Sequence, residues 1–224
     1  MALSSGRLDE LQTRVLDVLG GIEPPFVLSG GAALAGFHLG HRTTRDLDLF
    51  WRNRADLGDL PHVVQQRLTG AGLSVTTLQT TPAFVRLRVV DGSAVVVVDL
   101  IAEASNGIVA AEQHTVGRVQ ILVDSPRAIL AEKLCALLER SELRDLIDVD
   151  ALIRSGESLD VALADAPRRD GGFSPLALAW VLRDFDVKEL ALVAGIDGPT
   201  ASGLDAFRRS LVERLIEPRS NAEA

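Results

Sequence analysis

The spacing of hydrophobic and polar positions changes character near residue 124 of this 224-residue chain. Before that point, short apolar runs are separated by glycine, proline, aspartate and threonine, which is typical of β-strands joined by turns. After it, apolar positions recur at helical spacing. We therefore predict a mixed α/β part over 1–124, a helical C-terminal region over 125–218 and a frayed tail over 219–224.

The individual elements follow from the same spacing, together with capping and turn signals. The predicted strands are 26–29, 46–51, 73–80, 83–90, 93–101 and 118–124. The predicted helices are 7–19, 32–39, 61–68, 126–139, 142–153, 158–165, 174–184, 187–194 and 199–216. The pair Asp91-Gly92 predicts a tight hairpin between two strands. Residues 167–175 are predicted to form a loop.

Composition narrows the class of protein. Hydrophobic residues make up 47% and charged residues 24% of the chain, as in ordinary folded soluble proteins. No apolar run approaches the roughly 20 residues that a membrane helix needs, and the first residues lack the layout of a signal peptide. The single cysteine, Cys135, excludes an internal disulfide. These features predict a soluble cytoplasmic protein without membrane attachment.

Charge adds one constraint and one candidate. The net charge of −8 argues against a uniformly basic nucleic-acid-binding protein. Only Lys133 and Lys188 are lysines among the 23 basic residues, so Lys133 stands out in a chain that otherwise uses arginine. The histidines and the cysteine show no zinc-ligand spacing. A local basic patch stays open, because four arginines crowd around one short stretch: Arg42, Arg45, Arg52 and Arg54.

That stretch carries two aspartates on a predicted strand. Residues two apart on a strand point to the same face, so Asp46 and Asp48 project together. Two carboxylates held this close repel one another unless a cation lies between them. A third carboxylate, Asp99, ends an apolar run that suits a central strand. Three carboxylates on neighbouring strands suit a site for phosphoryl or nucleotidyl transfer with Mg²⁺ or Mn²⁺.

A glycine pair precedes the aspartates. Gly30 and Gly31 lie between a predicted strand and a predicted helix, where backbone amides can face a triphosphate. Either element alone is weak evidence. The order of strand, glycine pair, helix, arginine loop and Asp-Leu-Asp is more specific than any one of its parts.

Residues 26–50 resemble the signature of the nucleotidyltransferase superfamily with a polymerase-beta-like core. More narrowly, they resemble the AbiEii/AbiGii-type toxin family (MenT-like), and the resemblance extends over about residues 25–155. Lys133 matches the family's helical lysine. Its Arg-Asp-x-x-Asp helix matches Arg144, Asp145 and Asp148. The residues that match the first motif are Gly30, Gly31, Leu34, Arg42, Thr44, Asp46 and Asp48.

The resemblance implies metal-dependent transfer of a nucleotide from an NTP to an acceptor. It implies an α/β core with a mixed sheet, RNA (often tRNA) as acceptor, and a possible cognate antitoxin as partner. The metal ligands would be Asp46, Asp48 and Asp99. The implied catalytic residues are Asp46, Asp48, Asp99, Lys133, Asp145 and Asp148. The implied nucleotide-binding residues are Gly30, Gly31, Arg42 and Thr44.

Two departures leave the choice of NTP open. Many superfamily members have serine where this chain has Gly31, and related chains often carry a hydroxyl residue in place of Ala32. The same residues could also have purely structural roles. The aspartate pair could end a solvated strand, Lys133 could extend to solvent from the edge of an apolar helix face, and Asp145 with Asp148 could belong to a salt-bridged helix surface.

Three functions remain open from the sequence. The first is a toxin-type enzyme that modifies RNA, for which the arginines around the site argue. The second is the same chemistry on a small molecule, as in antibiotic-modifying nucleotidyltransferases, which the acidic net charge mildly favours. The third is a non-catalytic member that binds nucleotide or a protein, against which the intact set of three aspartates argues.

Overall fold

The computed structural model describes residues 8–105 and 110–217 and divides the chain into two compact units, Met1–Ile129 and Leu130–Ala224. The boundary lies inside helix α4 (Pro126–Arg140). Each unit is described by itself. The predicted tail at 219–224 lies outside the described residues.

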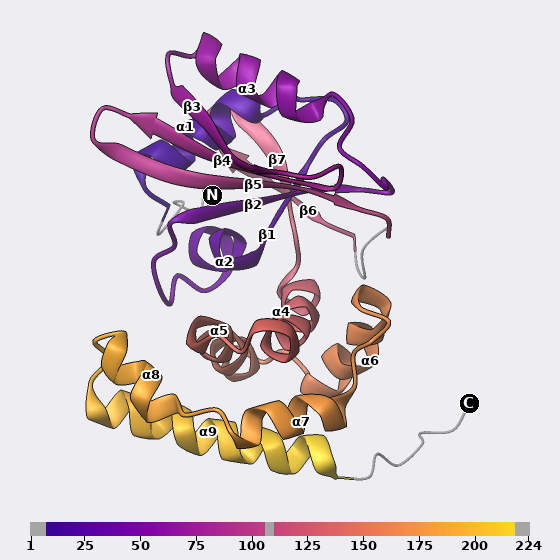
Figure 1. Cartoon of the computed structure of the whole chain (residues 1–224), viewed down its shortest axis with the longest axis vertical. Coiled ribbons are helices and arrows are strands. Elements are labelled where there is room, and N and C mark those ends of the chain that lie inside the picture. Colours follow the sequence, from indigo (N-terminus) through magenta and orange to yellow (C-terminus); the bar gives the residue numbers. More distant parts are fainter. Residues whose placement is uncertain (1–7, 106–109, 218–224) are drawn as a thin grey trace. The chain divides into compact units, whose positions relative to one another are not determined.

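A seven-stranded mixed sheet forms the centre of the first unit, in the order β3-β4-β5-β2-β1-β7-β6 (Figure 1). Strand β2 pairs with β5, and β1 with β7, in parallel, while the other neighbouring pairs are antiparallel. The mixed α/β fold is thereby confirmed. The strands are β1 (Val27–Ser29), β2 (Asp46–Arg52), β3 (Ser74–Thr80), β4 (Phe84–Asp91), β5 (Ala94–Glu103), β6 (Glu112–Val116) and β7 (Val119–Val123).

Helices cover the two faces of this sheet unequally. Helices α1 (Glu10–Leu19) and α3 (Leu60–Gly70) lie on one face, and α2 (Gly30–Ala33) lies on the other (Figure 1). The alternation along β2 explains the layering, because Leu47, Leu49 and Trp51 are buried while the residues between them are only half-buried. Asp46 and Asp48 therefore point to the opposite face of the sheet from these three apolar residues.

Three elements of the first unit differ from the sequence prediction. Helix α1 begins at Glu10 rather than at residue 7, because Asp9 caps it: the Asp9 carboxylate accepts from the amide of Gln12, and the Gln12 side chain accepts from the amide of Asp9. The segment after Gly30 runs on as a π-helix, Leu34–His38. Strand β6 was not predicted because its sequence, EQHTV, is mostly polar; in the structure Glu112, Gln113 and Thr115 are exposed.

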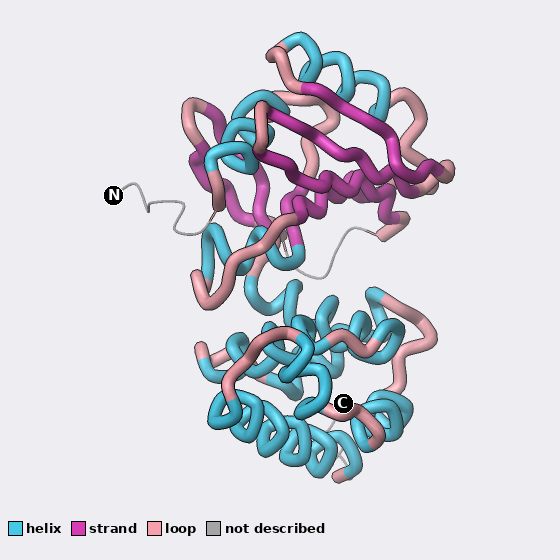
Figure 2. The backbone as a smooth tube through the Cα atoms, turned by 60° about the vertical axis from the view of Figure 1, so that its left-hand side comes forward, coloured by secondary structure: helices cyan, strands magenta, loops and turns pink. Residues whose placement is uncertain are grey.

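The described residues of the second unit form helices joined by loops and turns (Figure 2), as the sequence predicted. One boundary was wrong: α6 continues through Pro167 to Arg169, so the predicted loop at 167–175 is shorter. Proline is tolerated there because it removes a single backbone bond in the last turns of a helix whose Leu163 and Ala166 are buried. The helices are α4, α5 (Leu143–Arg154), α6 (Leu159–Arg169), α7 (Pro175–Arg183), α8 (Val187–Val193) and α9 (Gly198–Ile216).

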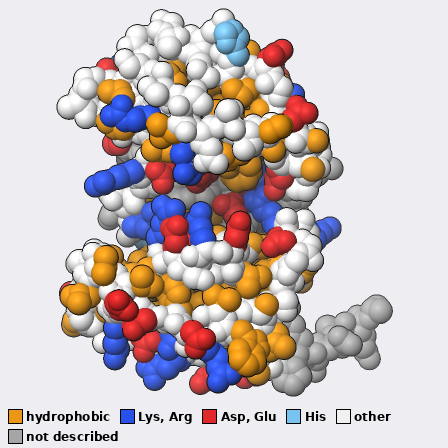
Figure 3. Space-filling view, viewed as in Figure 1, with side chains coloured by type: hydrophobic (Ala, Val, Ile, Leu, Met, Phe, Trp, Pro, Cys, Tyr) orange, Lys and Arg blue, Asp and Glu red, His pale blue; other side chains and the backbone are white. Residues whose placement is uncertain are grey.

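Several large apolar side chains of the second unit are exposed. Trp180 and Leu176 on α7, and Leu192 and Val193 on α8, each expose more than half of their surface. Figure 3 shows apolar side chains on the visible surface of these helices. None of the described helices is long and apolar enough to cross a membrane.

Candidate active site

The sheet brings the three predicted carboxylates to one face. Asp48 on β2 lies opposite Asp99 on β5, and its other neighbour is Ser29 at the end of β1. Asp46 lies two residues before Asp48 and so points the same way. Asp46 and Asp48 are half-buried and Asp99 is buried. The row of carboxylates thus spans two neighbouring strands, β2 and β5, and Ser29 of β1 lies beside it.

An arginine continues this row onto the next strand. Arg86 on β4 lies opposite Asp99, and its guanidinium forms a two-pronged ion pair with that carboxylate. Nε donates to Oδ1 at 2.8 Å and Nη2 donates to Oδ2 at 2.6 Å. The pKa of Arg86 is raised, chiefly by the hydrogen bond to Asp99 against the opposing effect of burial, with smaller contributions from the charges of Asp46 and Asp48. The Arg86 guanidinium therefore interacts electrostatically with all three carboxylates of the row.

Gly30 lets the chain pass close to the aspartates. Its φ of 64° is in the left-handed region that favours glycine. A Cβ atom at this position would collide with Oδ2 of Asp48. The turn from β1 into α2 thus places backbone directly against one of the candidate metal ligands, and only glycine fits there.

Gly31 lies against the other two candidate nucleotide-binding residues. A Cβ on Gly31 would lie 2.8 Å from Nη2 of Arg42 and 3.2 Å from Oγ1 of Thr44. The loop that carries them is anchored from α1, because the fully buried Gln12 donates its side-chain amide to the Thr44 carbonyl at 3.1 Å. The structure therefore brings Gly30, Gly31, Arg42, Thr44, Asp46, Asp48 and Asp99 into one region of the first unit.

We expect Gly30→Ala to destabilise the protein by about 1–3 kcal/mol, the usual cost of a left-handed non-glycine residue, and by more through the collision with Asp48. Gly92→Ala is the matched control, because Gly92 has a φ of 58° but nothing within 4 Å of its added Cβ. Urea unfolding of both variants measures the difference. Equal stability of the two variants would contradict a tight fit at Gly30.

The remaining predicted catalytic residues form a buried cluster in the second unit. The Lys133 ammonium on α4 donates to Oδ1 of Asp145 at 2.8 Å and lies 3.0 Å from Oδ2 of Asp148 on α5. The Lys133 side chain is 4% exposed and both carboxylates are 0% exposed. Lys133 therefore does not extend to solvent, and the two aspartates do not form an exposed salt-bridged surface.

Opposite charges within this cluster shift the pKa values of Lys133 and Asp145. Burial lowers the pKa of Lys133, but the carboxylates of Asp148 and Asp145 outweigh it, so the pKa is raised overall. Burial raises the pKa of Asp145, but Arg140 and Lys133 outweigh it, so that pKa is lowered. Arg140 donates to both oxygens of Asp145 at 2.9 Å. The matched Arg144 pairs instead with Glu142. Lys133 and Asp145 therefore stabilise each other's charged forms.

The donor set of the first unit fits an ion that shares its ligands with a substrate. Among residues 8–105 and 110–217, no three His, Cys, Asp or Glu side chains form a group that could hold a metal ion alone. Magnesium in phosphate chemistry commonly takes one or two carboxylates and completes its shell with phosphates and water. Asp46 and Asp48 supply that number of hard oxygen ligands, whereas both oxygens of Asp99 already accept from Arg86.

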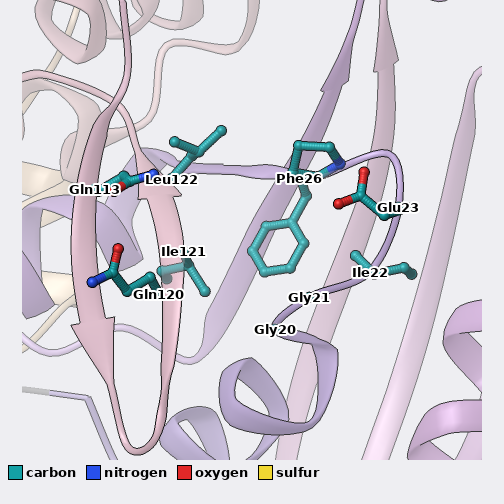
Figure 4. Close-up of a pocket in the computed structure, with 10 residues that line it drawn as sticks. Gly20, Gly21, Ile22, Glu23, Phe26, Gln113, Gln120, Ile121 and Leu122 are labelled. Carbon is teal, nitrogen blue, oxygen red and sulfur yellow. The ribbon is translucent and has the colours of Figure 1, made fainter.

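A cavity of about 260 Å³ lies at the opposite end of β1 from Asp48 (Figure 4). It is formed by the turn between α1 and β1 and by β7, with Phe26 and Ile121 among its lining residues. Its wall is apolar apart from Glu23 and two glutamines, so it lacks the cations and clustered carboxylates that a triphosphate site needs. The carboxylate row remains the candidate active site.

The comparison with protein families decides the family. The model described as "Nucleotidyl transferase AbiEii toxin, Type IV TA system" matches residues 14–213. The chain belongs to this family. It is therefore a nucleotidyltransferase of a toxin–antitoxin class, as the motifs around Asp46 and Lys133 predicted. Comparison with curated proteins gave no match.

Solved structures share the fold of this AbiEii-family chain. MenT4, a nucleotidyltransferase toxin from Mycobacterium tuberculosis, has a TM-score of 0.57 and 18% identity, covering 92% of this chain and 89% of its own. JHP933 from Helicobacter pylori has a TM-score of 0.54 and 20% identity, covering 92% and 90%. The antibiotic-resistance factor ANT(2'')-Ia has a TM-score of 0.52 and 12% identity, covering 72% and 92%. At these identities the likeness shows the fold.

Sequence reasoning missed two residues that organise the site of this family member. Gln12 anchors the loop before Asp46, and no sequence signal beyond the capping box singles it out. Arg86 could have been found. The Asp91-Gly92 hairpin fixes the register of β4 and β5, and Arg86 and Asp99 lie at equal distances from that turn.

Proposed function

We propose that this AbiEii-family protein is a cytoplasmic enzyme that transfers a nucleotide from an NTP to RNA, with tRNA as the acceptor class, using Mg²⁺ or Mn²⁺. The observation that carries the proposal is the row of Asp46, Asp48 and Asp99 beside a glycine turn, on a fold shared with nucleotidyltransferases. Membership of a type IV toxin–antitoxin family supports a cognate antitoxin as a further partner.

The residues of the candidate site would bind the ion and the NTP. Asp46 and Asp48 would hold the ion, which when bound neutralises charge on the NTP phosphates. The helical segment that begins at Gly30 has backbone amides without intrahelical acceptors, and these would face the triphosphate. Arg42 and Thr44, packed against Gly31, would contact phosphate or nucleotide. Each of these groups is held in position before the reaction and would stabilise negative charge that develops on the phosphates.

The transfer itself is an in-line displacement. The acceptor hydroxyl oxygen attacks the α-phosphorus, and its proton moves to a carboxylate oxygen of Asp99. The bond from the α-phosphorus to the oxygen that bridges to the β-phosphorus breaks, and pyrophosphate leaves with that electron pair. The products are the nucleotidylated acceptor and pyrophosphate. Lys133, Asp145 and Asp148 stay proposed catalytic residues, and the activity of their variants tests that role.

The first experiment identifies the nucleotide and the acceptor together. Purified protein is incubated with Mg²⁺, each α-labelled NTP in turn, and total tRNA. We expect label to enter RNA with one or a few NTPs and to disappear when EDTA removes the ion. A protein that binds NTP but labels no RNA would contradict RNA as acceptor. The same assay with small hydroxyl compounds, such as aminoglycosides, then tests the alternative acceptor class.

Salt dependence separates the two acceptor classes. An RNA acceptor is held partly through its phosphates, so kcat/KM for transfer should fall steeply as salt is raised. A protein that neutralises about three phosphates should lose roughly 20-fold in kcat/KM between 50 and 200 mM salt, taking a slope near −0.7 per phosphate. Transfer to a small uncharged hydroxyl compound should change little over that range.

A further inference from the structure

The proposed chemistry makes Asp99 the proton acceptor, and the contacts of Asp99 bear on that role. A third carboxylate beside Asp46 and Asp48 has two uses in nucleotidyl transfer: it can help to hold a second divalent ion, or it can accept the proton of the attacking hydroxyl. The two uses make different demands on its oxygens. A second ion needs direct coordination by Asp99, while proton acceptance needs one lone pair and a fixed orientation.

The guanidinium of Arg86 is the cation that binds Asp99 in this structure. Its fork engages Oδ1 and Oδ2 at 2.8 and 2.6 Å, in the parallel arrangement that makes arginine–carboxylate pairs strong and directional. The Asp99 side chain is only 8% exposed, whereas Arg86 is 44% exposed and approaches from the neighbouring strand. The backbone register of β4 and β5 holds the two residues opposite one another, so the pair is built into the sheet.

Two further observations tie Arg86 to the site. The charges of Asp46 and Asp48 both act on its guanidinium, so it shares their field as well as that of Asp99. The Phe84 ring, two residues along the same face of β4, lies 5.4 Å from the guanidinium carbon. The Arg86 side chain therefore contacts both its carboxylate partner and an aromatic ring, and the pairing of β4 fixes its backbone.

We propose that Arg86 takes the place of a second divalent ion at Asp99, so that the site loads one ion, held by Asp46 and Asp48, and Asp99 serves as the proton acceptor in an orientation fixed by Arg86. This inference rests on the proposed function. Arg86 is a positioning residue in it, because it acts through Asp99. A divalent ion placed at Asp99 would lie beside the guanidinium charge and would compete for the same oxygens.

Counting bound ions tests this directly. Full-length protein is mixed with Mn²⁺ and an NTP whose α,β-bridging oxygen is replaced by methylene, and bound Mn²⁺ is counted by electron paramagnetic resonance. After subtraction of the Mn²⁺ bound to free nucleotide in solution, we expect one Mn²⁺ per wild-type protein. We expect two Mn²⁺ per protein in Arg86→Gln, because this change removes the guanidinium from Asp99. Arg88→Gln is the matched control: Arg88 is exposed, lies two residues further along β4 and faces Val97, so it should bind one.

Activity supplies the second readout. Arg86→Gln should lower kcat about 10- to 100-fold, the range expected for losing a charged hydrogen-bonding partner, while KM for NTP changes little. Arg86→Lys should restore part of kcat and keep the count at one ion. Thermal unfolding checks that the variants are folded.

The possible failures are distinguishable. Two Mn²⁺ in wild type, or the same count in wild type and Arg86→Gln, overturns the role of Arg86 and leaves nucleotidyl transfer standing. No Mn²⁺–nucleotide binding and no transfer by wild type overturns the proposed function, and this inference falls with it.

Discussion

Replacing Asp46 and Asp48 together by asparagine is expected to abolish nucleotidyl transfer without unfolding the protein. Two carboxylates that hold an ion against the NTP phosphates supply several kcal/mol of transition-state stabilisation. At about 1.4 kcal/mol per tenfold change in rate, their loss should lower kcat/KM by roughly 1,000-fold or more. The measurement is label transfer to the acceptor at saturating Mg²⁺.

The stability of the same variant should not fall. The carboxylates of β2 lie beside buried Asp99, and Arg86 is already engaged with Asp99. Like charges at this spacing raise the free energy of the folded state, so the melting temperature of the double variant should be unchanged or higher. Asp59→Asn is the control, because Asp59 is exposed and its side chain makes no cap hydrogen bond to α3. Loss of activity with loss of folding would show a structural role instead.

Much of the first unit could be predicted because its local signals agree with its packing. The alternation along β2, the glycines after β1 and the Asp91-Gly92 turn each identify one element without reference to the rest. These same elements carry the candidate site, so its residues could be named before the structure was known. The order of the strands could not, since parallel pairing of β1 with β7 depends on contacts between distant segments.

The misses have a common physical cause. Strand β6 is held by pairing with β7 at the edge of the sheet, so its side chains need not be apolar and its sequence carries no strand pattern. Gln12 is fixed by a carbonyl 32 positions along the chain. The burial of Lys133, Asp145 and Asp148 depends on how α4 packs on α5, and a helix pattern alone cannot separate an exposed charge from a buried, paired one.

Lys133→Met is expected to have the largest effect on stability. It leaves two fully buried carboxylates without their ammonium partner, which for a buried ion pair costs about 3–5 kcal/mol. For a chain of this size that corresponds to a fall in melting temperature of roughly 6–20 °C. Lys188→Met is the matched control, because Lys188 is the chain's other lysine and is exposed on α8. Calorimetry measures both.

The size of this effect should not depend on pH near neutrality. The Asp145 pKa is lowered, so its contribution to stability is present above the ordinary aspartate pKa near 4 and is lost only as the pH falls through its lower folded value. The Lys133 pKa is raised, so its contribution is complete below about 10.4 and is lost only as the pH rises through its higher folded value. Between about pH 6 and 9, the range of ordinary assays, Lys133 and Asp145 therefore both stay charged.

A second variant separates the structural role of Lys133 from its proposed catalytic one. Lys133→Met combined with Asp148→Leu removes both the ammonium and one carboxylate, while Asp145 keeps its two hydrogen bonds from Arg140. Replacing a buried ion pair by apolar side chains is often close to neutral, so most of the melting temperature should return. Nucleotidyl transfer should stay lost if Lys133 is a catalytic residue. Recovery of both stability and transfer would assign Lys133 and Asp148 to the scaffold alone, because a charge that catalysis requires cannot be replaced by packing.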